Sequence, residues 1–266
     1  MIQILGIPFD ANASFMRGSA LAPDFIRLME TDGSANTFAE NGENIAAEIC
    51  YKDVGNIYFP NEDSTLGFKL IRSTLLDLLS TKAKIIAFGG DHSISFPVID
   101  AFTTYYPQLH VLHFDAHADL YENFGNNPFS HASPFARILE KGNIGSLTQV
   151  GIRTLNTHQK EQAQHYGVKL IEMNAYHEDW IAALPSPLYI SIDMDVLDPA
   201  FAPGVSHHEP GGMSTRTLLN CLQKIKSTVV GADIVELNPT RDFHNMTAMA
   251  AYKIFKEVAA LMLRNP

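Results

Sequence analysis

Three short stretches of this chain carry carboxylates and imidazoles at spacings that metal sites use. Residues 115–119 read Asp-Ala-His-Ala-Asp, residues 193–195 read Asp-Met-Asp, and residues 89–92 end a Gly-Gly-Asp run on a histidine. In an extended backbone, residues two apart point to the same side, so the polar groups of each stretch can converge. The six candidate metal ligands are His92, Asp115, His117, Asp119, Asp193 and Asp195.

The four carboxylates of this set could not crowd together in a protein interior without cations, because desolvated like charges repel strongly. Two divalent metal ions would compensate them and would supply hydroxide from water near neutral pH. The ligands are hard oxygens and imidazoles without a thiolate, which favours manganese over iron, cobalt or zinc. The sequence therefore predicts two Mn²⁺ per chain.

Each ligand stretch follows a short apolar run of the kind that forms a buried strand, at 84–89, 109–114 and 188–192. Polar groups that follow consecutive runs are expected where a site lies at the carboxyl edge of a parallel sheet. A single Asp-x-His or Asp-x-Asp is more often a turn or a surface feature. The same arrangement at three runs favours one shared site.

Strand-like runs alternate with helical patterns along the whole chain, which predicts an α/β fold with a mostly parallel sheet covered on both faces. No linker, repeat or low-complexity segment interrupts the alternation, so residues 1–266 are expected to form a single domain. The expected strands are 2–7, a weak one near 46–51, 84–89, 109–114, 147–152, 168–172, 188–192 and 229–235. The expected helices are 23–30, 65–80, 96–105, 134–141, 157–165, 178–183, 215–226 and 246–264.

The composition is that of an ordinary soluble enzyme, with 46% hydrophobic and 18% charged residues. A net charge of −10 argues against nucleic acid or an anionic membrane as partner. Only two cysteines are present, and the N-terminus lacks the basic and apolar regions of a signal peptide. No apolar stretch approaches the roughly 20 residues that a membrane span requires. A cytoplasmic location is expected.

Two long loops, 120–133 and 198–214, follow ligand stretches and should border the site. His131 ends the first loop, where it could shuttle protons or simply be an exposed loop residue. Glu236 ends the strand 229–235, where it could pair with a cationic substrate.

The roles of other polar residues near these stretches are less specifically predicted. His113 lies within its predicted strand and is expected to be a hydrogen-bonded core residue rather than a ligand. The pair His207 and His208 is expected to be solvated. Arg153 and Arg241 could bind an anionic substrate or pair with acids, and the pairing is favoured.

The motifs Gly89-Gly-Asp-His-Ser93, Asp115-Ala-His-Ala-Asp119 and Ser191-Ile-Asp-Met-Asp-Val-Leu-Asp-Pro199 resemble the three signatures of the ureohydrolase family. The resemblance extends from Gly6 to Pro239, which is nearly the whole chain. It implies an arginase-like three-layer α/β/α fold, a manganese-dependent hydrolase that releases urea and an amine from a small guanidino cation, and a homo-oligomer, trimeric or hexameric.

The resemblance also implies roles for single residues. Of the two metals, one would be bound by His92, Asp115, Asp119 and Asp193, and the other by His117, Asp115, Asp193 and Asp195. Asp119, His131 and Glu236 would be catalytic: Asp119 would carry a proton to the leaving amine, His131 would relay protons, and Glu236 would orient the guanidinium.

The substrate is predicted from the loops. Tyr121 and Asn156 stand where arginases have polar and acidic groups for the amino-acid head of the substrate, so an agmatinase-like activity is expected and both residues are candidate substrate contacts. Arginase and formimidoylglutamase activities are the alternatives within the family. A deacetylase-like enzyme with one zinc and a non-catalytic scaffold are the alternatives outside it.

Overall fold

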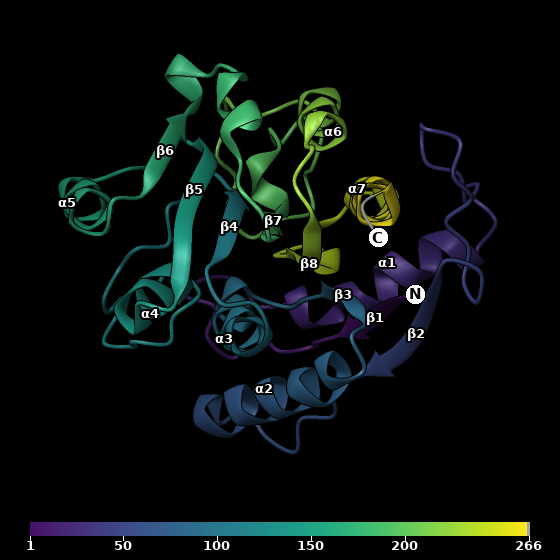
Figure 1. Ribbon diagram of the computed structural model, residues 1–266, viewed down its shortest axis with the longest axis horizontal. Helices are drawn as coiled ribbons and strands as arrows, with labels where there is room; N and C mark the ends of the chain where they lie inside the picture. Colours follow the sequence, from purple (N-terminus) through teal and green to yellow (C-terminus); the bar gives the residue numbers. More distant parts are fainter. Residues whose placement is uncertain (265–266) are drawn as a thin grey trace.

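Eight parallel strands form one sheet in the order β2-β1-β3-β8-β7-β4-β5-β6 in the computed structural model, which describes residues 1–264 (Figure 1). The strands are β1 (Ile2–Gly6), β2 (Tyr51–Asn56), β3 (Lys84–Phe88), β4 (Leu109–Phe114), β5 (Ile144–Ile152), β6 (Lys169–Glu172), β7 (Leu188–Asp193) and β8 (Val229–Val235). The helices are α1 (Ala22–Thr31), α2 (Ser64–Ser80), α3 (Ser95–Tyr105), α4 (Pro134–Lys141), α5 (Thr157–Tyr166), α6 (Thr215–Lys224) and α7 (Met246–Arg264).

The direction of each crossover explains which face its helix covers. Connections between parallel strands are right-handed, so crossovers that run in opposite directions along the sheet place their helices on opposite faces. Helices α2, α3, α4 and α5 belong to connections that run toward β6, and α1 and α6 to connections that run toward β2. The buried apolar residues accordingly form two clusters, one with α1, α6 and α7 and the other with α2 to α5. This confirms the predicted three-layer fold.

Burial along the strands follows their place in the sheet. Every residue of the central strands β7 and β8 is buried, as expected for parallel strands covered on both faces. The edge strands differ: β2 buries only Tyr51 fully, and β6 has four residues, of which only Ile171 is buried. None of the helices within residues 1–264 has the length and apolarity needed to cross a membrane.

Two predicted elements need correction. The weak strand expected at 46–51 is a turn in which Glu48 has a left-handed φ of 61°, and the strand runs over Tyr51–Asn56 instead. Its polar residues Lys52 and Asp53 are compatible with an edge position and leave little apolar pattern to find. The helix expected at 178–183 is a short 3₁₀ helix, Asp179–Ala183, and Pro185 disfavours its extension through Leu184.

Candidate metal centre and active site

The site lies at the carboxyl edge of the sheet, where four neighbouring strands end. His92 follows β3, Asp115 follows β4, Asp193 ends β7 and Glu236 follows β8, and these strands are adjacent in the order β3-β8-β7-β4. Residues separated by up to 144 positions in the sequence therefore meet at one edge, and the backbone N–H of His92 donates to Glu236 Oε1 at 2.9 Å.

The backbone at this edge is held in unusual conformations. A Cβ at Gly90 would lie 2.0 Å from the carbonyl oxygen of Phe9, so only glycine permits the loop after β3 to pass this close to the loop after β1. Asp119 and Glu236 have left-handed φ values of 51° and 62°. Residues other than glycine adopt such backbone conformations where the surrounding structure holds them there, commonly at functional sites.

His92 Nδ1 faces three carboxylates. It lies 3.1 Å from Asp115 Oδ2, 3.2 Å from Asp119 Oδ2 and 3.1 Å from Asp193 Oδ2. All four side chains are almost completely buried. One imidazole nitrogen surrounded by carboxylate oxygens of three different residues is a donor set that fits a divalent cation.

The opposite side of the His92 ring fixes which nitrogen carries the proton. Nε2 lies 3.0 Å from Ser191 Oγ, which itself donates to Asp233 Oδ1 at 2.6 Å. Because the Ser191 hydroxyl proton is directed to Asp233, Ser191 accepts from a protonated Nε2. In the neutral ring, which metal ligation requires, Nδ1 then carries the lone pair and faces the carboxylates.

Asp115 faces two groups at once. Its Oδ2 is near His92, whereas its Oδ1 lies 3.3 Å from His117 Nδ1. His117 Nδ1 also lies 3.0 Å from Asp195 Oδ2. Asp115, His117 and Asp195 thus form a second group that could hold a metal ion, with Asp115 common to both.

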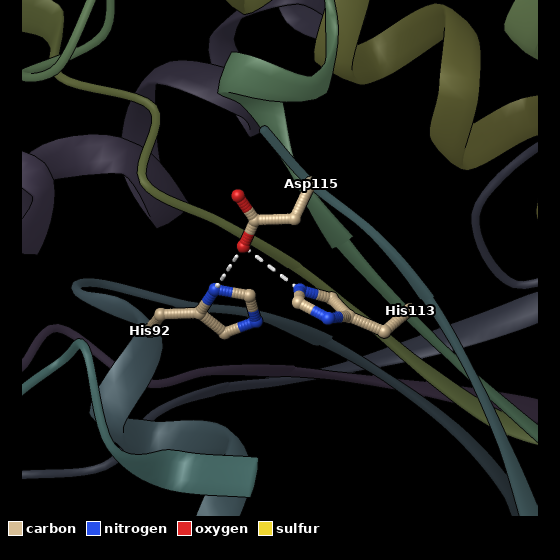
Figure 2. A group of neighbouring side chains, drawn as sticks. All are labelled: His92, His113 and Asp115. Atoms are coloured by element: carbon tan, nitrogen blue, oxygen red, sulfur yellow. Dashed lines mark hydrogen bonds and ion pairs between the residues drawn. The ribbon is translucent and has the colours of Figure 1, made fainter. Parts of the chain in front are cut away.

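His113 lies beside the first group but serves another purpose. Figure 2 shows His92 and His113 directed at the same oxygen of Asp115, and His113 Nε2 is 2.8 Å from it. Gln149 Nε2 donates to the Ala118 carbonyl at 2.6 Å and lies 2.9 Å from His113 Nδ1. The carbonyl fixes this amide as a donor, so His113 accepts at Nδ1 and donates from Nε2. Its position within hydrogen-bonding reach of Asp115 agrees with the core role expected from the sequence.

Glu236 and His131 form a buried pair. His131 Nδ1 lies 2.7 Å from Glu236 Oε1, and its Nε2 lies 2.8 Å from Ser14 Oγ. Burial disfavours the imidazolium, but the Glu236 carboxylate outweighs it and raises the pKa of His131 to about 9. The His131 partner holds the pKa of Glu236 below its usual range despite burial. The two side chains are therefore a charged pair connected to Ser14.

Without cations, the carboxylate cluster retains protons. Burial and then the charge of Asp195 raise the pKa of Asp193 well above its usual value, and burial and then Asp115 raise that of Asp195 to about 6. Burial opposes the imidazolium forms of His92 and His117, but the neighbouring aspartates raise both pKa values. Divalent cations would take the place of these protons, so the residues fit a metal centre.

A cavity of about 250 Å³ opens onto these groups. It is bounded by both predicted loops and by the loop that follows β1. Its lining residues are Ser14, His117, Asp119, Tyr121, Phe124, His131, Ala132, Thr154, Gln159, Asp193, Asp195, Val205, Ser206, His207, Glu209 and Glu236.

The two candidate substrate contacts lie in different positions. Tyr121 lines the cavity, whereas Asn156 does not: its side chain caps α5 by accepting from the Gln159 N–H at 2.9 Å. Asn156 Nδ2 also donates to the Tyr121 hydroxyl at 2.6 Å. Asn156 thus reaches the cavity only through Tyr121.

Several residues of the site were not identified from the sequence. Ser14 and Glu209 line the cavity, and so does His207, which was expected to be solvated. The Pro and Gly residues on both sides of His207 predict defined turns, but they do not predict where its side chain points. Only the position of this loop beside a ligand stretch could have suggested His207 as a residue of the site. The expected pairing of Arg153 with acids is wrong, since its guanidinium donates to the carbonyls of Asp195 and Glu209. It thereby fixes the loop that borders the cavity.

Comparison with known proteins gives a consistent assignment. The model of the arginase family matches residues 1–261. Arginase 1, mitochondrial, of Arabidopsis thaliana is 42% identical over 97% of this chain and 80% of its own length. An agmatinase of Bacillus cereus is 31% identical over 97% of this chain and 90% of its own length. The solved arginase of Medicago truncatula superimposes with a TM-score of 0.92 at 40% identity, covering 98% of this chain and 87% of that one.

The family match spans almost the whole chain and coincides with the clustered His and Asp side chains at the carboxyl edge. Members of this family are known for a binuclear metal centre and hydrolyse guanidino C–N bonds. The chain belongs to the arginase family and is a hydrolase of that class.

Proposed function

We propose that this enzyme hydrolyses L-arginine to urea and L-ornithine with two Mn²⁺ per chain. The observation that carries the reaction class is a cavity that is lined by Glu236 beside the clustered ligands and has no Lys or Arg among its lining residues within 1–264. The choice of arginine within that class rests on the 40–42% identity to plant arginases. Such a cavity favours a cation and disfavours an anion. Formimidoylglutamate carries two carboxylates, so it is a poor match.

The proposed ligands are those expected from the resemblance, with Asp115 and Asp193 common to both ions. Asp115 supports this division, because its Oδ2 faces His92 and its Oδ1 faces His117. When bound, two divalent ions supply a water of lowered pKa for attack on a guanidinium carbon. The mixed oxygen and imidazole set favours manganese.

The protein side chains supply orientation and proton transfer. The Oε2 atom of Glu236 has no hydrogen-bond partner within the described residues, and we assign it to the substrate guanidinium, a charge-assisted contact. Asp119 accepts a proton and passes it to the leaving amine. His131 relays protons through Ser14, whose hydroxyl lies within hydrogen-bonding distance of its Nε2.

Two observations bear on the identity of the substrate. The plant relatives named arginase are 40–42% identical to this chain and the Bacillus relatives named agmatinase 31%, which favours arginine. Agmatine, the substrate expected from Tyr121 and Asn156, is the second candidate, because it lacks the carboxylate for which the lining offers no cationic partner.

A substrate panel distinguishes these candidates. The manganese-loaded enzyme is assayed with arginine, agmatine, guanidinobutyrate and formimidoylglutamate, with urea and formamide release measured separately. The proposal requires the highest kcat/KM on arginine, since this ratio measures discrimination. A clear preference for agmatine would establish the second candidate, and formamide release would refute both.

Glu236→Gln provides the matched test of mechanism. It preserves shape but removes the charge that pairs with the guanidinium, so kcat/KM should fall at least ~100-fold, the loss of roughly 3 kcal/mol expected for a charged hydrogen bond. Both metals should be retained. Substantial activity in this variant would remove Glu236 from the site.

Other expectations stay predictions: a cytoplasmic location and a trimeric or hexameric assembly. The metal content tests the remaining alternatives, because one ion per chain would favour a deacetylase-like reaction. A scaffold would show no turnover of any guanidino compound.

A further inference from the structure

His207 is fixed in place by its neighbours, not by hydrogen bonds of its own. On one side, Ser206 Oγ donates to the Met16 carbonyl at 2.8 Å and accepts from Asn238 Nδ2 at 2.9 Å. On the other side, His208 Nε2 lies 2.7 Å from the Pro203 carbonyl. The backbone on both sides of His207 is thus held against other loops.

The ring of His207 lies against the reaction site. Its centroid is 5.7 Å from that of His117 and 5.5 Å from that of His131, the proposed metal ligand and proton relay. Phe15 packs against the ring at 5.5 Å. The ring lines the cavity, and within residues 1–264 neither of its nitrogens has a hydrogen-bond partner. An imidazole that is held by the backbone and packed between aromatic rings is a rigid wall.

We propose that His207 is a specificity-determining residue whose ring limits the room around the guanidinium and excludes guanidino groups that carry an extra substituent. The inference rests on the proposed function, because a guanidinium paired with Glu236 lies beside His131 and therefore beside the His207 ring. Since the ring lies against both His117 and His131, a methyl group on the guanidinium nitrogen facing it would overlap the ring.

The test compares two substrates in four proteins. Wild type, His207→Ala, His207→Phe and His177→Ala are assayed with the preferred guanidino substrate and with its N-methylguanidino analogue. Removing a wall of this size should lower the discrimination between the two by at least ~10-fold, because one methyl group in a fitted pocket is worth 10–200-fold. His207→Phe keeps a ring in place and should retain the discrimination.

His177→Ala is the control, because this histidine is exposed, does not line the cavity and takes no part in holding the loop of His207. It should leave the discrimination unchanged, and all variants should retain two metals per chain by elemental analysis. Unchanged discrimination in His207→Ala, equal loss in His207→Phe or loss of metal from His207→Ala would each overturn the proposal. Wild-type turnover of the preferred substrate tests the proposed function separately.

Discussion

Asp115 is the residue on which the proposed metal centre depends most. Its two oxygens face different histidines, its Oδ1 accepts from the His117 backbone N–H at 2.6 Å, and its Oδ2 is within 2.8 Å of His113. This many partners can be satisfied only by an ionised carboxylate, and His113, His117 and His92 hold the pKa of Asp115 well below its usual value despite burial. Each part of the site therefore depends on this one charge.

Asp115→Ala should empty both metal positions and abolish activity, because the residue is shared between the two groups. His92→Ala should weaken mainly one position and leave residual activity. Inductively coupled plasma analysis of the purified variants measures the metal per chain. Retention of one tightly held ion by Asp115→Ala would contradict the shared role.

His131→Ala should lower kcat by roughly 100-fold, the lower range for a lost acid–base group, while changing KM less. The physical reason is its contact with both Glu236 and Ser14, which connects the buried pair to the cavity. Added imidazole should partly restore turnover. Full activity across neutral pH would make His131 a structural residue.

At the residue scale, the sequence predicts side chains that share a local motif and misses those that meet through folding. The six proposed ligands follow strands in a recurring pattern, so they could be identified without coordinates. Ser14 and His207 carry no such pattern, because their contacts with His131 come from loops 117 and 76 residues away in the sequence.

At the scale of elements, the cap of α5 connects helix stability to the cavity wall. Asn156 caps the helix and also donates to the Tyr121 hydroxyl, so one side chain has two partners. Asn156 was a candidate substrate contact because it stands where arginases have an acidic group for the head of the substrate. The sequence could not show that the side chain turns into the helix.

Asn156→Ala should lower the free energy of unfolding by about 1 kcal/mol through the lost cap. Asn156→Ser should restore most of this stability, because serine also caps helices, but it is too short to reach Tyr121. Urea denaturation measures stability, and kcat/KM reports the position of Tyr121. If both variants have wild-type kcat/KM, Asn156 has no influence on substrate.

Element prediction succeeded where burial is strong and failed where it is weak. The central strands and long helices bury regular apolar patterns, and their predicted bounds lie within a few residues of the structure. The edge strand β2 buries little, so its position is not encoded in the pattern. The 3₁₀ helix Asp179–Ala183 buries Trp180 and Ile181, but two adjacent buried positions do not distinguish a 3₁₀ helix from an α-helix.

At the scale of the whole molecule, the metal centre couples stability to pH. In the metal-free protein the folded-state pKa values of Asp193, Asp195, His92 and His117 are raised, so the folded state binds more protons than the unfolded state. The contribution of Asp195 to the stability of the metal-free protein should therefore be lost as the pH rises above about 4. The contribution of the histidines should be lost as the pH rises above about 6.5. The lowered pKa values of Asp115 and Glu236 act only at lower pH.

Because metal ions compete with these protons, the increase in Tm on adding Mn²⁺ should grow between pH 6 and pH 8.5. Differential scanning fluorimetry with and without manganese measures it. Asp115→Ala is the control and should show little increase at any pH. A metal-induced increase that is constant or shrinks with pH would show that protons and metal do not share these ligands.

The two sheet edges have a consequence for how copies of this chain associate. An exposed parallel edge offers unpaired backbone groups on which another strand could grow, and long apolar edges seed fibrous aggregates. Here β6 is only four residues long, with Lys169 exposed, and β2 exposes Lys52 and Asp53 along most of its length. These charges disfavour pairing between the edge strands of two copies. An ordered assembly of this protein must therefore form through its helices and loops, and the sheets of separate copies should not join even at high protein concentration.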